Sequence, residues 1–262
     1  MKYPCIDVDS PYTQDQFLNW MHSHEQDAKE RRSTVKAAFF PPAKAAQLSD
    51  LNLYALSQLT GTSYSCVLVI GNLADTTEQN GICLPEQDIE SFDTLFRKID
   101  VRIPQQIARK IKSIKYHDQL IHYKALSLLE HSEIGYSLPI IAEKTPMIPV
   151  IPLLYKKCDP SLLAKIINIF YNFNTLIIII GMMSHSLSII EAKSMDSSTI
   201  SKIIALDDSV SHLQSNAYVA LNGLLQLCDT RFLRPKVLTY QIIESDQQYI
   251  NKSGCASIVF YK

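Results

Sequence analysis

Glycine is scarce in this sequence. Seven glycines occur in 262 residues, less than half of the usual share of about 7%. Neither of the glycine-rich phosphate-binding motifs, GxGxxG and GxxxxGK[ST], is present. We therefore predict no nucleotide cofactor held by such a turn, and nothing in the sequence indicates any other cofactor.

An excess of charge of either sign is also lacking. The chain has 25 Lys and Arg residues against 26 Asp and Glu residues, a net charge of -1 and a pI of about 6.6. Without a basic excess, there is no electrostatic reason to expect binding to nucleic acid or to an anionic membrane. The short basic run at 29–32 (KERR) is interpreted as solvated surface.

Long hydrophobic runs and paired cysteines are missing as well. The longest apolar stretch, 166–183, is interrupted by Asn168, Asn172 and Asn174, and a transmembrane helix needs about 20 apolar residues. The first residues lack the apolar core of a signal peptide. The six cysteines form no CxxC motif, so neither a zinc knuckle nor a redox pair is indicated. These features predict a cytoplasmic protein with reduced thiols.

What the sequence does contain is an alternation of strand and helix patterns. Hydrophobic residues make up 47% of the chain and charged residues 19%, enough apolar side chains for a sizeable core. Strands are expected at 35–40, 66–70, 147–154, 175–180, 235–243 and 255–261, and helices at 45–59, 104–113, 132–142, 159–171, 196–206 and 212–227. This order predicts one α/β domain over 1–262, with a central mixed sheet and helices on both faces.

Two of the expected strands have distinctive compositions. Residues 176–180 read LIIII, and a strand without polar positions is typical of the centre of a sheet covered on both faces. Pro149 and Pro152 interrupt the strand at 147–154. Because proline cannot donate to a β-ladder, this strand is predicted to be bent or near an edge.

The apolar strand leads into a polar segment, GMMSHS at 181–186, and such strand ends commonly carry active sites. His185 is a candidate catalytic base or ligand, with a hydrogen-bonded histidine at a strand end as the alternative. His131 and Glu133 form a second candidate acid–base pair. They are two residues apart, so on a helix their side chains would point in different directions.

In this order of elements the sequence resembles the Memo family, which includes protein B of the AmmeMemoRadiSam system and is related in fold to class III (LigB-type) extradiol dioxygenases. The segments that carry the resemblance are SPYTQDQFLNWM (10–21), AAFFPPAKA (37–45), LVIGNLAD (68–75), HSEIGYSLPII (131–141), MIPVIPLL (147–154), IIGMMSHS (179–186) and SNAYVALNGLLQL (215–227). They are similar to the family's opening segment and to its segments APHAGY, ILGPNHH, EHSIEVQLPFL, IVPILVG, SSDFSHY and CGYGPIAALLEA. The resemblance implies a Memo/LigB-dioxygenase-like fold.

The resemblance also implies where a metal site would lie, and most of its donors are missing. The positions matched to metal ligands are Pro42, Ala74, Met182 and Asn216, while His185 keeps the family's histidine and Tyr218 its tyrosine. Ser132 takes the place of the histidine in EHS when the Leu-Pro pair is aligned, with His131 one residue out of register. A transition-metal site needs several His, Cys, Asp or Glu ligands at one point, so we expect none here.

We therefore expect a non-catalytic, Memo-like protein that has lost the metal site and binds a partner protein or a small ligand. The residues expected to contact a ligand are Ser184, His185, Asn216 and Tyr218. One alternative is a metal-independent or altered enzyme (a hydrolase, a lyase or a dioxygenase-like enzyme) that uses His185. Another is a non-catalytic subunit of a hetero-oligomer with a metal-competent paralogue, and a homo-oligomer is also compatible with the sequence.

The missing donors give a first prediction. Protein purified without chelator or added metal should contain far less than about one iron, copper or zinc ion per chain, because Pro42 and Ala74 offer no donor atom. Elemental analysis measures this content directly. A stoichiometric metal that disappears in a His185→Ala variant would contradict it.

Overall fold

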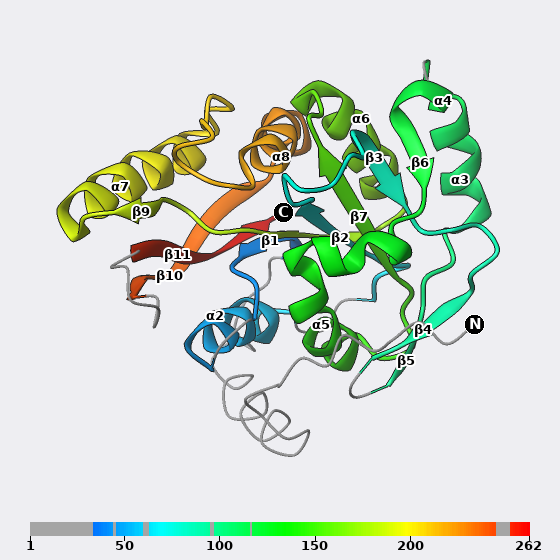
Figure 1. The fold of residues 1–262 in the computed structure, drawn as a ribbon, viewed down its shortest axis with the longest axis horizontal. Coiled ribbons are helices and arrows are strands. Elements are labelled where there is room, and N and C mark those ends of the chain that lie inside the picture. Colours follow the sequence, from blue (N-terminus) through cyan, green and yellow to red (C-terminus); the bar gives the residue numbers. More distant parts are fainter. Residues whose placement is uncertain (1–33, 44–45, 60–62, 95–96, 116, 245–251) are drawn as a thin grey trace.

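A mixed β-sheet runs through the middle of the protein (Figure 1). The computed structural model describes residues 34–43, 46–59, 63–94, 97–115, 117–244 and 252–262. Along the described sheet the strand order is β10-β11-β1-β8-β2-β7-β3-β6, and β9 pairs with β11. The strands are β1 (Val35–Phe40), β2 (Val67–Asn72), β3 (Gly81–Leu84), β6 (Ile121–Tyr123), β7 (Val150–Lys156), β8 (Leu176–Ile180), β9 (His185–Leu187), β10 (Arg234–Glu244) and β11 (Lys252–Tyr261).

Strand direction changes across this sheet. Strands β1, β8, β2 and β7 are parallel to one another, whereas β11 is antiparallel to β1 and β3 is antiparallel to β7. Strands β4 (Ser91–Asp93) and β5 (Lys98–Asp100) form a separate two-stranded sheet. The predicted α/β class with a mixed central sheet is confirmed.

Helices cover both faces of the sheet. They are α2 (Ala46–Ser57), α3 (Gln105–Lys112), α4 (His117–Leu120), α5 (Leu138–Lys144), α6 (Pro160–Tyr171), α7 (Ile189–Ala205) and α8 (Tyr218–Arg231), with 3-10 helices η2 (Leu126–His131) and η3 (Glu133–Tyr136). Alternate side chains of β8 point to opposite faces: Ile177 and Ile179 pack in a core with α3, α6 and α8, and Ile178 and Ile180 pack in a core with α2 and α5.

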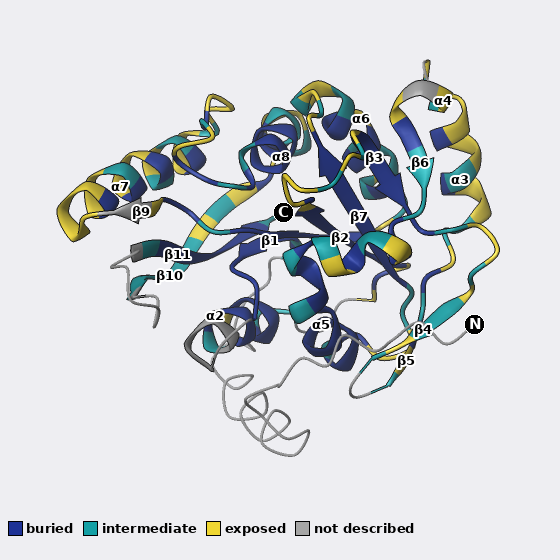
Figure 2. Cartoon of the chain, in the orientation of Figure 1, coloured by how far each residue is buried: buried dark blue, intermediate teal, exposed yellow. Residues whose placement is uncertain are grey.

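The LIIII strand lies in the middle, as its composition predicts. Strand β8 pairs with β1 on one side and β2 on the other. No residue of it is more than 3% exposed, and Figure 2 shows the central strands buried. The expectation of a central strand covered on both faces is confirmed.

Two predicted helix starts are wrong. The helix expected from Asp196 begins at Ile189, because the Ser188 and Glu191 side chains each bond the other residue's backbone in a capping box. The helix expected from His212 begins only at Tyr218, and residues 212–217 lie in turns and loop.

The single helix predicted over 132–142 is also wrong. The segment forms η3, followed by α5 from Leu138, with Ser137 between them. Pro139 lies in the first turn of α5, where its missing N–H leaves no helical hydrogen bond unmade. Proline therefore marks a helix start here and not a helix interior.

Strand β7 is internal, so the prediction of an edge position is wrong. It lies between β2 and β3. Pro152 pairs with Val69 of β2, but β3 reaches only Leu154, Tyr155 and Lys156. On the β3 side, Pro152 therefore has no partner strand that would need its missing N–H.

Two further observations concern membrane-spanning helices and disulfide bonds. Among the described residues, no helix is long and apolar enough to cross a bilayer. The described cysteines Cys66, Cys83, Cys158, Cys228 and Cys255 are free thiols.

The burial of β8 yields a matched prediction. Ile178→Ala should lower the free energy of unfolding by about 2–5 kcal/mol, since it leaves a cavity in a fully buried core. Ile190→Ala makes the same substitution at a position that is 82% exposed and should change stability by less than about 0.5 kcal/mol. Urea denaturation compares them, and equal losses would contradict the central position of β8.

Candidate functional site

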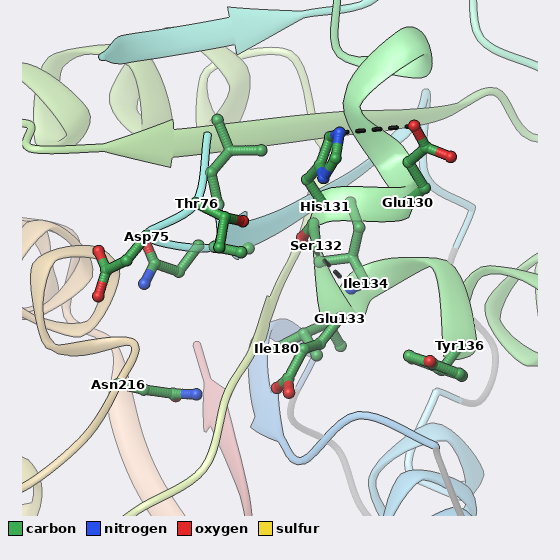
Figure 3. Close-up of a pocket in the computed structure, with 14 residues that line it drawn as sticks. Asp75, Thr76, Glu130, His131, Ser132, Glu133, Ile134, Tyr136, Ile180 and Asn216 are labelled. Atoms are coloured by element: carbon green, nitrogen blue, oxygen red, sulfur yellow. Dashed lines mark hydrogen bonds and ion pairs between the residues drawn. The ribbon is translucent and has the colours of Figure 1, made fainter. Parts of the chain in front are cut away.

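A cavity of about 420 Å³ opens where β2 and β8 end (Figure 3). Its walls come from the end of β2 and the loop after it, the turn between η2 and η3, the last residue of β8 and the turn before α8. The lining residues are Gly71, Asn72, Leu73, Ala74, Asp75, Thr76, Glu130, His131, Ser132, Glu133, Ile134, Tyr136, Ile180 and Asn216. Ligands of α/β proteins commonly bind at the carboxyl ends of parallel strands, which makes this cavity the candidate site.

Two glycines allow the walls to approach the strand ends. A Cβ atom on Gly71 would lie 2.0 Å from Cγ2 of Ile134 in η3, and one on Gly181 would lie 2.4 Å from Cβ of Ala217 and 2.8 Å from Oδ1 of Asn216. Real Cβ contacts are not this short, so both positions need a residue without a side chain. The shape of the site therefore depends on two of the few glycines in the sequence.

The side chain of Asn216 has a fixed orientation. The backbone N–H of Met182 donates to Oδ1 of Asn216 at 2.8 Å, and the hydroxyl of Ser215 donates to the Met182 carbonyl at 2.7 Å. With Oδ1 occupied as an acceptor, the Asn216 amide nitrogen points into the cavity (Figure 3). This nitrogen donates to no acceptor among the described residues.

The opposite wall is joined to the loop after β2 by backbone bonds. The N–H of Ala74 donates to the His131 carbonyl at 2.8 Å, and Leu73 forms a β-bridge with Ser132. Ser132 is 8% exposed, and its hydroxyl oxygen accepts one long hydrogen bond, 3.5 Å, from the backbone N–H of Ile134. These contacts hold residues 131–134 beside the end of β2.

Lys156, the last residue of β7, is hydrogen bonded to the loop after β2. Its ammonium group donates to the carbonyls of Asp75 at 2.7 Å and Thr77 at 2.5 Å. The residue is only 7% exposed, and a buried ammonium group needs such acceptors. Because both acceptors belong to one loop, Lys156 fixes the course of the cavity wall.

The ionisable groups of the lining are mainly acidic. Asp75, Glu130 and Glu133 face one basic side chain, His131, among the described lining residues. The Nε2 atom of His131 lies 3.4 Å from Oε1 of Glu130, while Glu133 points to the other side of the turn (Figure 3). The His131 ring thus contacts Glu130 and not Glu133, its expected partner.

The cavity takes in only some of the side chains expected to contact a ligand. Asn216 and His131 line it, whereas Ser184, His185 and Tyr218 are not among its lining residues. His185 is exposed on β9 opposite Ser253 of β11, and Tyr218 is half-buried in the first turn of α8. These three side chains lie outside the cavity.

Ser184 belongs to a separate buried network. Its N–H donates to Oδ1 of Asp196 at 2.9 Å, and the Tyr240 hydroxyl donates to Oδ2 at 2.8 Å. A Cβ on Gly254 would lie 1.8 Å from Oδ2, so the carboxylate occupies space that only a glycine leaves open. The Ser184 hydroxyl oxygen has no hydrogen-bond partner in the described structure. Asp196 therefore ties α7 to the segment after β8.

The same surroundings make Cys255 a poor nucleophile. Burial, with the nearby Asp196 carboxylate, raises the pKa of the Cys255 thiol to about 12. The thiol lies 3.8 Å from the sulfur of Met182. A protonated, buried thiol packs as a small apolar group.

Three of the four positions matched to metal ligands lie near one another. Ala74 and Asn216 line the cavity, and Met182 is hydrogen bonded to Asn216 through its backbone. Pro42 is buried in the loop after β1. In the part of the chain that the structure describes, no group of three His, Cys, Asp or Glu side chains is arranged to hold a metal ion.

The sequence analysis named Glu133, as a candidate partner of His131, but missed Asp75 and Glu130, the other acidic residues of the lining. Asp75 ends the segment LVIGNLAD, and Glu130 and Glu133 flank His131 and Ser132. A signal was present in these neighbours of the matched positions. These carboxylates stand beside the positions matched to metal ligands and not at them, so the resemblance gave them no role.

Comparisons with known proteins do not assign this chain to a family. No family model matches the sequence, and no curated protein matches it significantly. Among solved structures, the chain is similar to the crystal structure of the uncharacterized protein JW3007 from Escherichia coli K12. The identity is 11%, with a TM-score of 0.49 over 85% of this chain and 99% of that chain. A similarity at this level assigns no family.

The role of Lys156 can be tested through the loop that it holds. A hydrogen bond to a charged group contributes about 1.5–3 kcal/mol, and about 1.4 kcal/mol corresponds to tenfold. Lys156→Met should therefore speed hydrogen exchange at the amides of Ala74 and Thr77 by about tenfold or more. Lys157→Met, at the exposed neighbouring position, is the control, and equal exchange in both variants would argue against this role.

Proposed function

We propose that this protein is a non-catalytic binding protein with a Memo/LigB-dioxygenase-like fold, and that it binds a small ligand in the cavity at the ends of β2 and β8. The observation that carries the proposal is the cavity itself. Its volume, about 420 Å³, is within the range of small-molecule sites, roughly 300–1,000 Å³. It lies at the edge of the sheet where ligands of this fold class bind.

The placement of matched residues supports the proposed relationship to the Memo family. Ala74, Met182 and Asn216 are far apart in the sequence, and each is matched to a metal ligand by the resemblance. Ala74 and Asn216 line one cavity, and Met182 is bonded to Asn216. A resemblance that matched unrelated segments would not be expected to bring these positions together.

The side chains of the cavity support binding over catalysis. Among the described lining residues, no hydrogen bond joins a hydroxyl or thiol to His131, whose ring lies beside the Glu130 carboxylate. Ser132 instead accepts from a backbone N–H. A nucleophile needs an adjacent base within hydrogen-bond reach, and this arrangement does not supply one.

The proposal predicts that blocking the cavity abolishes binding. Ala74 is exposed on the cavity wall, so Ala74→Trp should fill the cavity without disturbing the core. Ala205→Trp makes the same change at an exposed alanine at the end of α7. A library of small amines, sugars, acids and amides is screened by thermal shift, and binding is measured by calorimetry.

A ligand should raise the melting temperature of the wild type and of Ala205→Trp, but not that of Ala74→Trp, because ligand stabilises only a state that binds it. Binding unaffected by Ala74→Trp would place the site elsewhere. The same preparations are assayed for hydrolase and ring-cleaving activity. Turnover that is lost in His185→Ala, in a variant that remains folded, would replace the proposal by an altered enzyme.

A further inference from the structure

The central sheet ends in two strands of very different length. At one end lies β6, with three residues, and at the other end lies β10, with 11 residues. Among the described strands, β10 pairs with β11 alone, so the backbone groups on its outer side have no strand partner there. A short edge strand offers little to another chain, whereas a long one presents a row of N–H and C=O groups that a further strand can pair with.

Only the first part of β10 carries features that discourage such pairing. Pro235 has no N–H, Lys236 is exposed and charged, and Leu238 is an extra residue in the register with β11, which makes a bulge. Residues 239–243 (TYQII) contain no proline, no charge and no bulge, and they are half-buried. This second part of the strand is therefore free to accept a partner strand.

Exposed apolar side chains gather on the elements that border β10. Helices α7 and α2 both contact this strand (Figure 1). Of the eight large apolar residues that are exposed in the described part of the chain, five lie on these helices or just before β10: Ile189, Ile190, Ile204, Tyr54 and Phe232. Exposed apolar residues that concentrate around one edge are typical of an interaction surface.

The order of charges along β10 favours a second copy of the same strand as the partner. The strand starts with two basic residues, Arg234 and Lys236, and ends at an acidic one, Glu244. Antiparallel pairing of two copies brings the basic start of each strand toward the acidic end of the other, whereas parallel pairing would bring like charges together. A two-fold contact also uses the same edge on both copies, so it leaves neither edge open.

We propose that two copies of this chain form a two-fold dimer by antiparallel pairing of residues 239–244 of β10. The pairing joins the two central sheets into one, and the apolar residues of α7 and α2 flank the new contact. No residue of β10 lines the cavity at the ends of β2 and β8. The interface is therefore separate from the proposed ligand site.

Sedimentation equilibrium on the full chain tests the dimer directly. Between about 1 and 100 μM protein, the measured mass should rise from that of a monomer toward that of a dimer, since interfaces of standard area bind with micromolar or tighter affinity. Hydrogen exchange at 239–244 should slow severalfold as the protein concentration rises, because these amides gain partners. Exchange in β6, at the other end of the sheet, is the control and should not depend on concentration.

Proline variants identify the edge. Successive N–H groups of a strand in an antiparallel sheet point to opposite sides, so one of Gln241→Pro and Ile242→Pro removes an outward N–H and the other removes one that faces β11. The outward variant should raise the dimer dissociation constant by about tenfold or more and keep the melting temperature of the dilute monomer, while the other should melt earlier. Gln241→Thr and Ile242→Val keep the N–H and should dimerise like the wild type.

Several results would overturn the proposed dimer. A monomer at every concentration would show that the edge does not pair with itself. A dimer that neither proline variant weakens would use another surface, and assemblies that grow beyond two chains would exclude a closed two-fold contact. If both proline variants unfold, hydrogen exchange of the wild type decides: protection of 239–244 that does not change with concentration would refute pairing through β10.

Discussion

The strict burial of β8 is the constraint on which the rest of the structure depends. Side chains of its isoleucines enter the cores on both faces of the sheet, so no position within the strand is free for a polar group without the cost of burying it. Polar chemistry is thereby displaced to the ends of the strands. The cavity begins where this apolar strand ends, at Ile180, and its polar groups come from loops and turns.

The transition from apolar strand to polar site depends on backbone contacts more than on side-chain pairs. Gly181 lets the turn before α8 approach, and the N–H of Met182 then orients Asn216. On the other wall, Gly71 lets η3 approach the end of β2. A larger residue at either glycine would separate the walls. The sparse glycines are thus used where backbones must come close, a requirement that composition alone does not reveal.

Much of the fold could be predicted from local patterns, and the failures have identifiable causes. Continuous apolar character located β8, and the helix expected at 159–171 matches α6, which Asp159 caps and Pro160 begins. The start of α7 was predicted too late because the capping box at its first turn was not recognised. An edge position was predicted for β7 because proline was taken to be incompatible with an inner strand. The short strands β3 and β6 were not predicted, because three or four residues carry too little periodicity to be recognised.

The site was harder to predict because its charges depend on distant contacts. The matched positions Ala74 and Asn216 lie at the cavity, yet neither residue type reveals that Asp75, Glu130 and Glu133 also line it. The segment after Met182 illustrates the same limit: a buried acid, Asp196, comes from α7 and accepts from the backbone N–H of Ser184. That carboxylate holds a helix to the sheet, while Asp75 is exposed on the cavity wall. Carboxylates with such different surroundings cannot be distinguished by sequence, since only the folded arrangement decides which of them a ligand can reach.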